Sequence, residues 1–195
     1  CSAIATFLAG RKLSRIGMLI DRSIINTVLL RVRYSVRSIS KSSGDRRTGV
    51  SAPLRRIALP MSKYFVCKRT AFTVAEAMEC LGGPGYVEET GLPRVYREAP
   101  LNSIWEGSGN VNALDLLRAL GKEPASLNAW LAEVGAVRGN DARFDAAVTG
   151  VLDQLARDPS QLEAQARLLA ERMALLLQGS ILMQNAPNEV ADAFV

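Results

Sequence analysis

Histidine is absent from the 195-residue sequence. Its absence excludes Ser-His-Asp and Cys-His catalysis, zinc sites built on imidazole, and proton shuttles that depend on histidine. Cysteine is scarce as well, because Cys1, Cys67 and Cys80 are scattered and form no CxxC pair. A disulfide framework is therefore excluded, and the sequence favours a reducing compartment such as the cytoplasm. We expect Cys67 and Cys80 to be small buried side chains on helix faces.

Long hydrophobic runs are also missing. Residues 18–30 are apolar, but Asp21 and Arg22 interrupt them, and the stretch is shorter than the roughly 20 clean residues of a membrane span. We therefore expect no membrane partner. The overall composition, 48% hydrophobic and 22% charged, is typical of a soluble globular protein that folds without a metal ion or a disulfide.

Acidic residues are nearly absent from the first third of the chain. Residues 1–69 hold 15 Lys and Arg against Asp21 and Asp45, whereas residues 70–195 hold nine Lys and Arg against 17 acids. Residues 31–51 are rich in Arg, Ser and Gly with little apolar periodicity, and we expect a basic, poorly specified or disordered segment over residues 1–51. Its interpretation stays open between an organelle transit peptide, a basic tail for nucleic acid, a solvated charge run, and the product of a truncated or frame-disturbed gene.

Beyond residue 51, apolar residues recur at helical spacing, and strand signals are almost absent. Residues 82–104 carry turn chemistry without a stable period, which predicts an ordered loop with at most a short helix near Glu88. The pattern predicts an all-α fold, most simply a helical bundle with antiparallel neighbours. Helices are expected from residue 52 to 81, from a cap at Ser108 or Asn110 to Gly121, from Pro124 to residue 134, from a cap at Asn140 to residue 155, and from Asp158 to near Gly179. In the second of these helices the expected apolar face consists of Val111, Leu114, Leu117 and Leu120.

The first candidate for chemistry is the run Gly82-Gly83-Pro84-Gly85. Such a run resembles a turn that cradles phosphate, but glycines that end a helix are far commoner. It lacks the following Lys-Ser/Thr of a P-loop, and it follows a helix instead of a strand, which excludes a Rossmann site. Both a phosphate turn and a plain helix terminator stay open on the residues alone.

The second candidate is Glu106, which stands between Trp105 and a glycine-rich helix start. Its carboxylate could simply interact with the helix N-terminus. Alternatively, the apolar neighbour Trp105 raises its pKa and makes it a general base near neutrality. Gly107 and Gly109 would let a bulky ligand approach the backbone, and the amides at the helix start suit an anionic or carbonyl group. No carboxylate cluster has the spacing of metal ligands.

Two stretches are similar to a known family. Residues 63–69 read K-Y-F-V-C-K-R, and residues 76–111 run from E-A-M-E-C-L-G-G-P-G-Y to N-S-I-W-E-G-S-G-N-V. Together they resemble the acyl-CoA dehydrogenase family, within it the AidB-like alkylation-response branch. The resemblance implies part of the C-terminal helical bundle of that family over residues 52–121, and an additional helical C-terminal region over residues 122–195.

The resemblance also implies a function. The family uses FAD to oxidise an acyl-CoA thioester between Cα and Cβ, and a glutamate removes the α-proton while the β-hydrogen leaves as hydride. Glu106 matches that catalytic base. The family is usually tetrameric, so a homo-oligomer is expected. Since its N-terminal helical domain and β-domain have no counterpart here, we expect the chain to be inactive alone. The segment along the flavin is matched by Ile104, Trp105, Gly107, Ser108 and Asn110, and the turn that contacts FAD of a neighbouring subunit by Gly82, Gly83 and Gly85.

Two alternative functions belong to other classes. The AidB-like branch is associated with DNA through its C-terminal region, with Arg118 and Lys122 as candidate contacts. Residues 123–195, however, hold five Arg, no Lys and ten acids, which disfavours binding to phosphates. A helical oligomerisation module is the other alternative, because a partial bundle leaves apolar helix faces uncovered.

Overall fold

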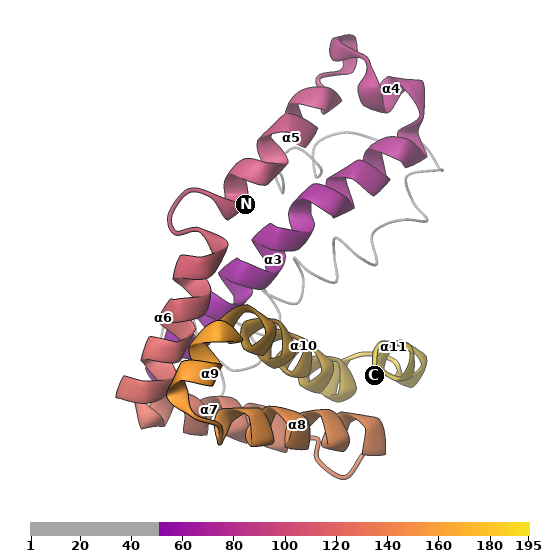
Figure 1. The fold of residues 1–195 in the computed structure, drawn as a ribbon. Helices are drawn as coiled ribbons and strands as arrows, with labels where there is room; N and C mark the ends of the chain where they lie inside the picture. Colours follow the sequence, from indigo (N-terminus) through magenta and orange to yellow (C-terminus); the bar gives the residue numbers. More distant parts are fainter. Residues whose placement is uncertain (1–50) are drawn as a thin grey trace.

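A computed structural model describes residues 51–195, and these residues fold into helices without a strand (Figure 1). The all-α prediction is therefore confirmed. The expected poorly specified segment lies, except for Ser51, outside the described residues. The apolar residues 18–30 lie outside them too. Within residues 51–195, none of the helices is both long enough and apolar enough to cross a membrane.

The longest helix is α3 (Ala52–Leu81), which begins and ends as predicted. Its start is capped by Ser51, whose hydroxyl accepts a hydrogen bond from the Leu54 amide at 3.3 Å. Its end is set by Gly82, which adopts φ of 61°, a conformation that glycine takes without steric cost. Helix α3 packs against most of the other elements, so it forms the spine of the molecule.

Residues 82–104 are mostly helical, so the prediction of a loop over this range is wrong. The segment contains α4 (Gly83–Tyr86), the 3₁₀ turn η2 (Glu88–Thr90), α5 (Leu92–Glu98) and the 3₁₀ turn η3 (Ala99–Ser103). Each element is at most two turns long, too short to show an apolar period. Pro84, Pro93 and Pro100 each stand in the first turn of a new helix, where the missing N–H costs nothing. Together with the C-terminal half of α3 these elements form an arm, visible at the top of Figure 1.

Helix α6 (Gly109–Lys122) has Ser108 as its N-cap residue, one of the two caps that the sequence predicted. Its buried face, however, differs from the prediction. Val111 and Leu114 are 57% and 39% exposed. The core side is taken instead by Gly109, Ala113, Leu116 and Ala119. Small residues let α6 approach α3 closely. A prediction based on large apolar residues therefore picks the wrong face of α6 as the buried one. Leu117 and Leu120 are partly buried against the core, as expected.

The C-terminal region contains α7 (Pro124–Gly135), α8 (Ala142–Leu155), α9 (Pro159–Ala164), α10 (Ala166–Asn185) and α11 (Asn188–Phe194). Pro124 opens α7 as predicted. The cap of α8 is Asp141 instead of Asn140. The helix expected from Asp158 to Gly179 is two helices, separated at Gln165, and α10 continues past Gly179 to Asn185. Gly179 lies inside α10 against α8, and a Cβ there would be 3.0 Å from Cε2 of Phe144, so its place is explained by tight packing and not by the end of a helix.

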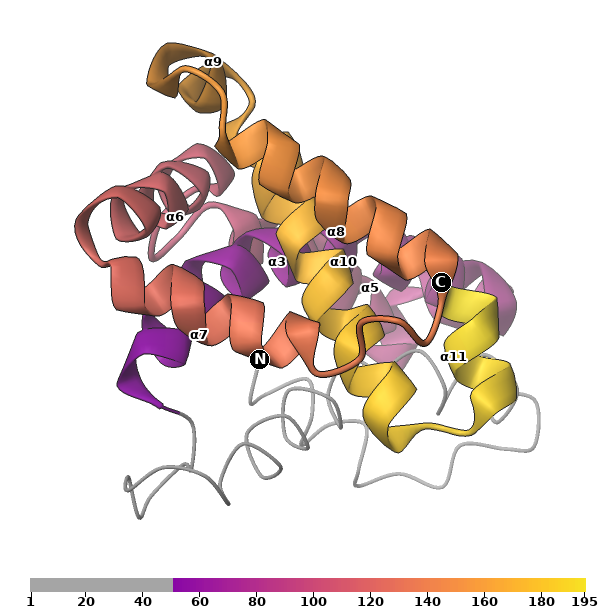
Figure 2. The same cartoon turned by 90° about the horizontal axis from the view of Figure 1, so that it is seen from below.

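One hydrophobic core is shared by the helices up to α6 and the helices from α7 onward. Helix α10 crosses α3 and α6 and is flanked by α7 and α8 (Figure 2). The core side chains with no exposed surface come from both sets of helices and include Ile57, Met61, Leu116, Trp130, Leu169 and Met173. Cys67 is buried as expected, whereas Cys80 is exposed, because it lies in the last turn of α3 on the arm.

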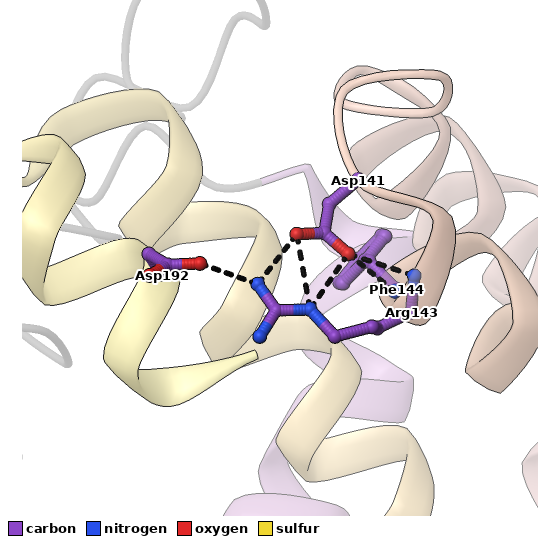
Figure 3. Close-up of polar contacts among 4 residues, drawn as sticks. All are labelled: Asp141, Arg143, Phe144 and Asp192. Atoms are coloured by element: carbon purple, nitrogen blue, oxygen red, sulfur yellow. Dashed lines mark hydrogen bonds and ion pairs between the residues drawn. The ribbon is translucent and has the colours of Figure 1, made fainter.

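The start of α8 is held by an ionic cluster that also ties down α11 (Figure 3). The Asp141 carboxylate accepts hydrogen bonds from the Arg143 side chain at 2.7 Å and from the amides of Arg143 and Phe144. Arg143 also donates to Asp192 of α11 at 2.6 Å. The Arg143 guanidinium, followed by the two amides, lowers the pKa of Asp141 from its ordinary 3.8 to about 2.

Acid should therefore weaken the fold through Asp141. Because its pKa is lower in the folded state, its carboxylate stabilises the fold fully above pH 3.8, and this stabilisation is lost as the pH falls toward 2. We expect the difference in Tm between the native chain and Asp141→Asn to shrink as the pH is lowered from 5 to 2. Asparagine keeps a capping oxygen, and Asp153→Asn, an exposed site on α8, controls for lost charge. A difference that stays constant with pH would contradict this assignment.

Candidate functional site

Glu106 lies in the connection between η3 and α6, in an unusual backbone conformation. Among residues 51–195 it is the only residue other than glycine with positive φ, at 52°. Gly107 follows with φ of 100°. The left-handed region costs an ordinary L-residue about 1–2 kcal/mol. Glu106 is exposed. The unusual backbone conformation is therefore not explained by burial of the Glu106 side chain.

Two polar side chains hold the main chain around Glu106. From α3, the Lys63 ammonium donates to the carbonyl oxygens of Asn102 at 2.8 Å and Trp105 at 3.0 Å. From α6, Nδ2 of Asn112 donates to the carbonyl oxygens of Gly107 at 2.7 Å and Ser108 at 2.9 Å. We call this arrangement the carbonyl clamp.

The residues next to Glu106 present apolar surface to solvent. Ile104 is 65% exposed and Trp105 is 53% exposed. The side chain of Ser108, although it is the N-cap residue, makes no capping hydrogen bond, so it does not occupy the amides of the first turn of α6. Asn110 in that turn is exposed as well. The connection therefore offers apolar side chains, a carboxylate and helix-start amides on adjacent residues.

The depression beside this connection is shallow. Its walls include Lys63, Tyr64, Lys68, Asn102, Gly107 and Asn112. Gly109 forms part of it, and a Cβ at that position would be 2.6 Å from Cε of Lys68, so a larger residue there would have to displace the end of the Lys68 side chain. Among residues 51–195, no group of three Cys, Asp or Glu side chains is placed to hold a metal ion.

The glycine run at the end of α3 has structural roles at two of its three positions. Gly82 has positive φ, and a Cβ on Gly85 would be 2.4 Å from the carbonyl oxygen of Met78. Gly83 differs, because its φ is ordinary and no atom lies within 4 Å of the position of its Cβ. The folding of the described chain explains Gly82 and Gly85, and it leaves Gly83 unexplained.

The structure does not bring the two candidate sites together within one chain. Helix α4, with the glycine run, lies at the far end of the arm from the start of α6 (Figure 1). The sequence analysis also missed the roles of Lys63 and Asn112. Lys63 binds carbonyls 39 and 42 residues further along the chain. Because every residue has a backbone carbonyl, the residue type at the acceptor position does not reveal such a bond.

The strain at Glu106 can be measured. Glu106→Gly should raise the free energy of unfolding of the chain by about 1 kcal/mol, because glycine adopts positive φ without the Cβ penalty. Glu106→Gln removes the same charge but keeps the Cβ, so it should leave stability nearly unchanged. Denaturant titrations of both variants test this. Equal stability of the two variants would show that the backbone of Glu106 is not strained.

Comparisons with known proteins agree with this architecture. Residues 27–121 match the model of the acyl-CoA dehydrogenase C-terminal domain. The chain is 41% identical to AidB of Escherichia coli (strain K12) over 151 residues, which is 77% of this chain and 27% of that protein. It is 30% identical to acyl-CoA dehydrogenase family member 11 of Caenorhabditis elegans, over 78% of this chain and 28% of the relative.

The fold comparison gives the same result. The solved structure of Caenorhabditis elegans ACDH-11 in complex with C11-CoA matches 85% of this chain and 31% of its own, with a TM-score of 0.63 and 28% identity. The chain therefore belongs to the acyl-CoA dehydrogenase family, on its AidB-like branch, and carries the C-terminal helical portion. It spans less than a third of the length of the curated relatives that it matches.

Proposed function

We propose that this chain supplies the catalytic base and part of the flavin site of an FAD-dependent acyl-CoA dehydrogenase. The observation that carries the proposal is the conformation of Glu106. Its backbone is held in a costly left-handed conformation while its side chain is left exposed. Backbone strain of this kind clusters at functional sites, where the surrounding structure maintains it. In the proposed reaction the Glu106 carboxylate removes the α-proton of an acyl-CoA thioester.

The residues around Glu106 have the chemistry that FAD requires. Exposed Ile104 and Trp105 provide apolar surface for a ring system, and Gly107 lacks a side chain that would obstruct it. Ser108 and Asn110 stand at a helix start with uncapped amides, which favour an anionic or carbonyl group. When bound, FAD accepts the hydride from Cβ of the substrate.

Gly82, Gly83 and Gly85 are proposed to contact FAD held by a second copy of the chain. Two observations support this assignment. Helix α4 lies at the far end of the arm from the start of α6 in the same chain (Figure 1), and Gly83 has open space where a Cβ would be. A glycine with an ordinary φ and no close neighbour suits the approach of a group from outside the chain. The functional protein is accordingly proposed to be a homo-oligomer in the cytoplasm.

The chain alone is proposed to be inactive. Catalysis requires the substrate and flavin to be held within about 3–3.5 Å of each other and of the base, and a ligand site normally encloses most of its ligand. Glu106 is exposed and the nearby depression is shallow. DNA binding is not proposed, because residues 123–195 carry ten acids against five Arg, and Arg118 is paired with Asp115.

A chimera tests the proposal. Residues 52–195 would replace the matching C-terminal portion of the C. elegans relative, whose structure was solved with C11-CoA. We expect the purified chimera to retain FAD and its flavin absorbance to bleach when C11-CoA is added without oxygen, whereas the 195-residue chain with added FAD shows neither effect. A chimera that folds and binds FAD but is not reduced, while the parent protein is, would overturn the proposal.

A further inference from the structure

The side chain of Glu106 does not hold its own position. Within the part of the chain that the structure describes, its carboxylate makes no hydrogen bond or ion pair, and its side chain is exposed. Its backbone nevertheless adopts positive φ. Something other than this side chain must therefore keep the connection in a conformation that an L-residue rarely takes.

Lys63 fixes the peptide that enters Glu106. The carbonyl of Trp105 and the nitrogen of Glu106 belong to the same planar peptide unit. When the ammonium binds the Trp105 oxygen at 3.0 Å, it restrains the plane of that unit, which is one of the two peptide planes whose relative orientation defines the φ and ψ of Glu106. The second bond, to the Asn102 oxygen at 2.8 Å, anchors the ammonium to the end of η3. The donor carries a full charge, which makes hydrogen bonds of this type stronger than neutral ones.

Asn112 fixes the chain on the other side of Glu106. Its amide nitrogen binds the carbonyl oxygens of Gly107 and Ser108 from the first turns of α6. The same nitrogen would be 3.2 Å from a Cβ on Gly107, so the side chain lies directly against this residue. Glu106 and the peptide that joins it to Gly107 thus lie between two held peptide units, 105–106 bound from α3 and 107–108 bound from α6.

We propose that Lys63 and Asn112 are positioning residues that fix the backbone of Glu106 and so aim its carboxylate. The inference rests on the proposed role of Glu106 as the base, while the mechanical part can be tested without any reaction. Misplacement of a catalytic group by about 1 Å can cost on the order of 100-fold in rate. The carbonyl clamp would therefore be needed for turnover even though neither side chain is proposed to touch the reacting atoms.

Amide hydrogen exchange of the full 195-residue chain tests the clamp itself. Lys63→Met and Asn112→Leu should each raise exchange in residues 103–109 at least tenfold, with changes below twofold in α10. Lys63→Arg should restore part of the protection, because a guanidinium can donate to both carbonyls. Lys122→Met, an exposed lysine at the end of α6, is the matched control and should change nothing in residues 103–109. Unchanged exchange in both clamp variants would overturn the inference.

Kinetic measurements in the chimera distinguish a role of Lys63 in positioning Glu106 from a role in stabilising the fold alone. Lys63→Met should lower kcat at least tenfold while KM for C11-CoA stays within about twofold, with Lys63→Arg in between. If exchange rises but kcat does not fall, the inference fails and the proposed function stands. If exchange rises but an unmodified chimera that folds and binds FAD is not reduced, while the parent protein is, the proposed function is overturned, although the clamp exists.

Discussion

In the chimera, Glu106→Gln is expected to slow the reduction of flavin by C11-CoA by about 10²–10⁴-fold, the range that general-base catalysis contributes. Glutamine has nearly the size of glutamate but cannot accept a proton under these conditions. The substitution also keeps the Cβ and hence the same backbone strain, so the loss would report the missing base. Anaerobic stopped-flow absorbance of the flavin measures the rate directly.

The matched control for this substitution is Glu89→Gln. Glu89 is an exposed glutamate in η2, outside the connection that carries Glu106. We expect its rate of flavin reduction to equal that of the unmodified chimera. A Glu106→Gln chimera that retains FAD and is reduced at the unmodified rate would exclude Glu106 as the base, whatever the resemblance implies.

Gly85→Ala is expected to destabilise the chain by about 1–3 kcal/mol, the usual cost of forcing extra volume into a packed site. The new Cβ would lie 2.4 Å from the carbonyl oxygen of Met78, which is backbone of α3 and cannot rotate away. It would also approach Cβ of Leu81 at 3.2 Å. The corner between α3 and α4 would have to open. Urea titrations followed by circular dichroism measure the change.

Gly83→Ala is the control two residues away, since no atom lies within 4 Å of its Cβ position and its φ is ordinary. Its stability should be unchanged or slightly raised, because alanine loses less conformational freedom on folding. Equal losses in the two variants would mean that the corner does not have the packing described. The same Gly83→Ala substitution in the chimera shows whether flavin retention depends on the open space at this position.

Long helices could be predicted from the sequence because they provide several turns of periodic residues together with clear ends. The sequence placed the end of α3 at Gly82 and the start of α7 at Pro124, and the structure agrees at both points. Short helices of the arm could not be predicted, because one or two turns contain too few residues to show a period. The buried face of α6 was misjudged for a different reason. Close packing against α3 favours glycine and alanine over larger apolar residues.

The candidate site could be predicted only in part. The Trp105-Glu106-Gly107 motif selects the connection between η3 and α6 as the candidate site, and this assignment stays a prediction; the structure leaves Ile104 and Trp105 exposed there. The sequence contains no indication that Glu106 adopts a left-handed conformation, since glycine or asparagine is the residue that usually indicates it. The carbonyl clamp had none either. Hydrogen bonds from side chains to distant backbone oxygens depend on the tertiary fold alone.

The shared core has an energetic consequence for the C-terminal region. The family model ends at residue 121, yet Trp130, Leu169 and Met173 are packed in the same interior as Ile57 and Leu116. The later helices are therefore not a removable appendage that could be gained or lost independently. A volume change on α10 has to be accommodated on α3 or α6, so core substitutions in the helices before and after residue 121 are energetically coupled.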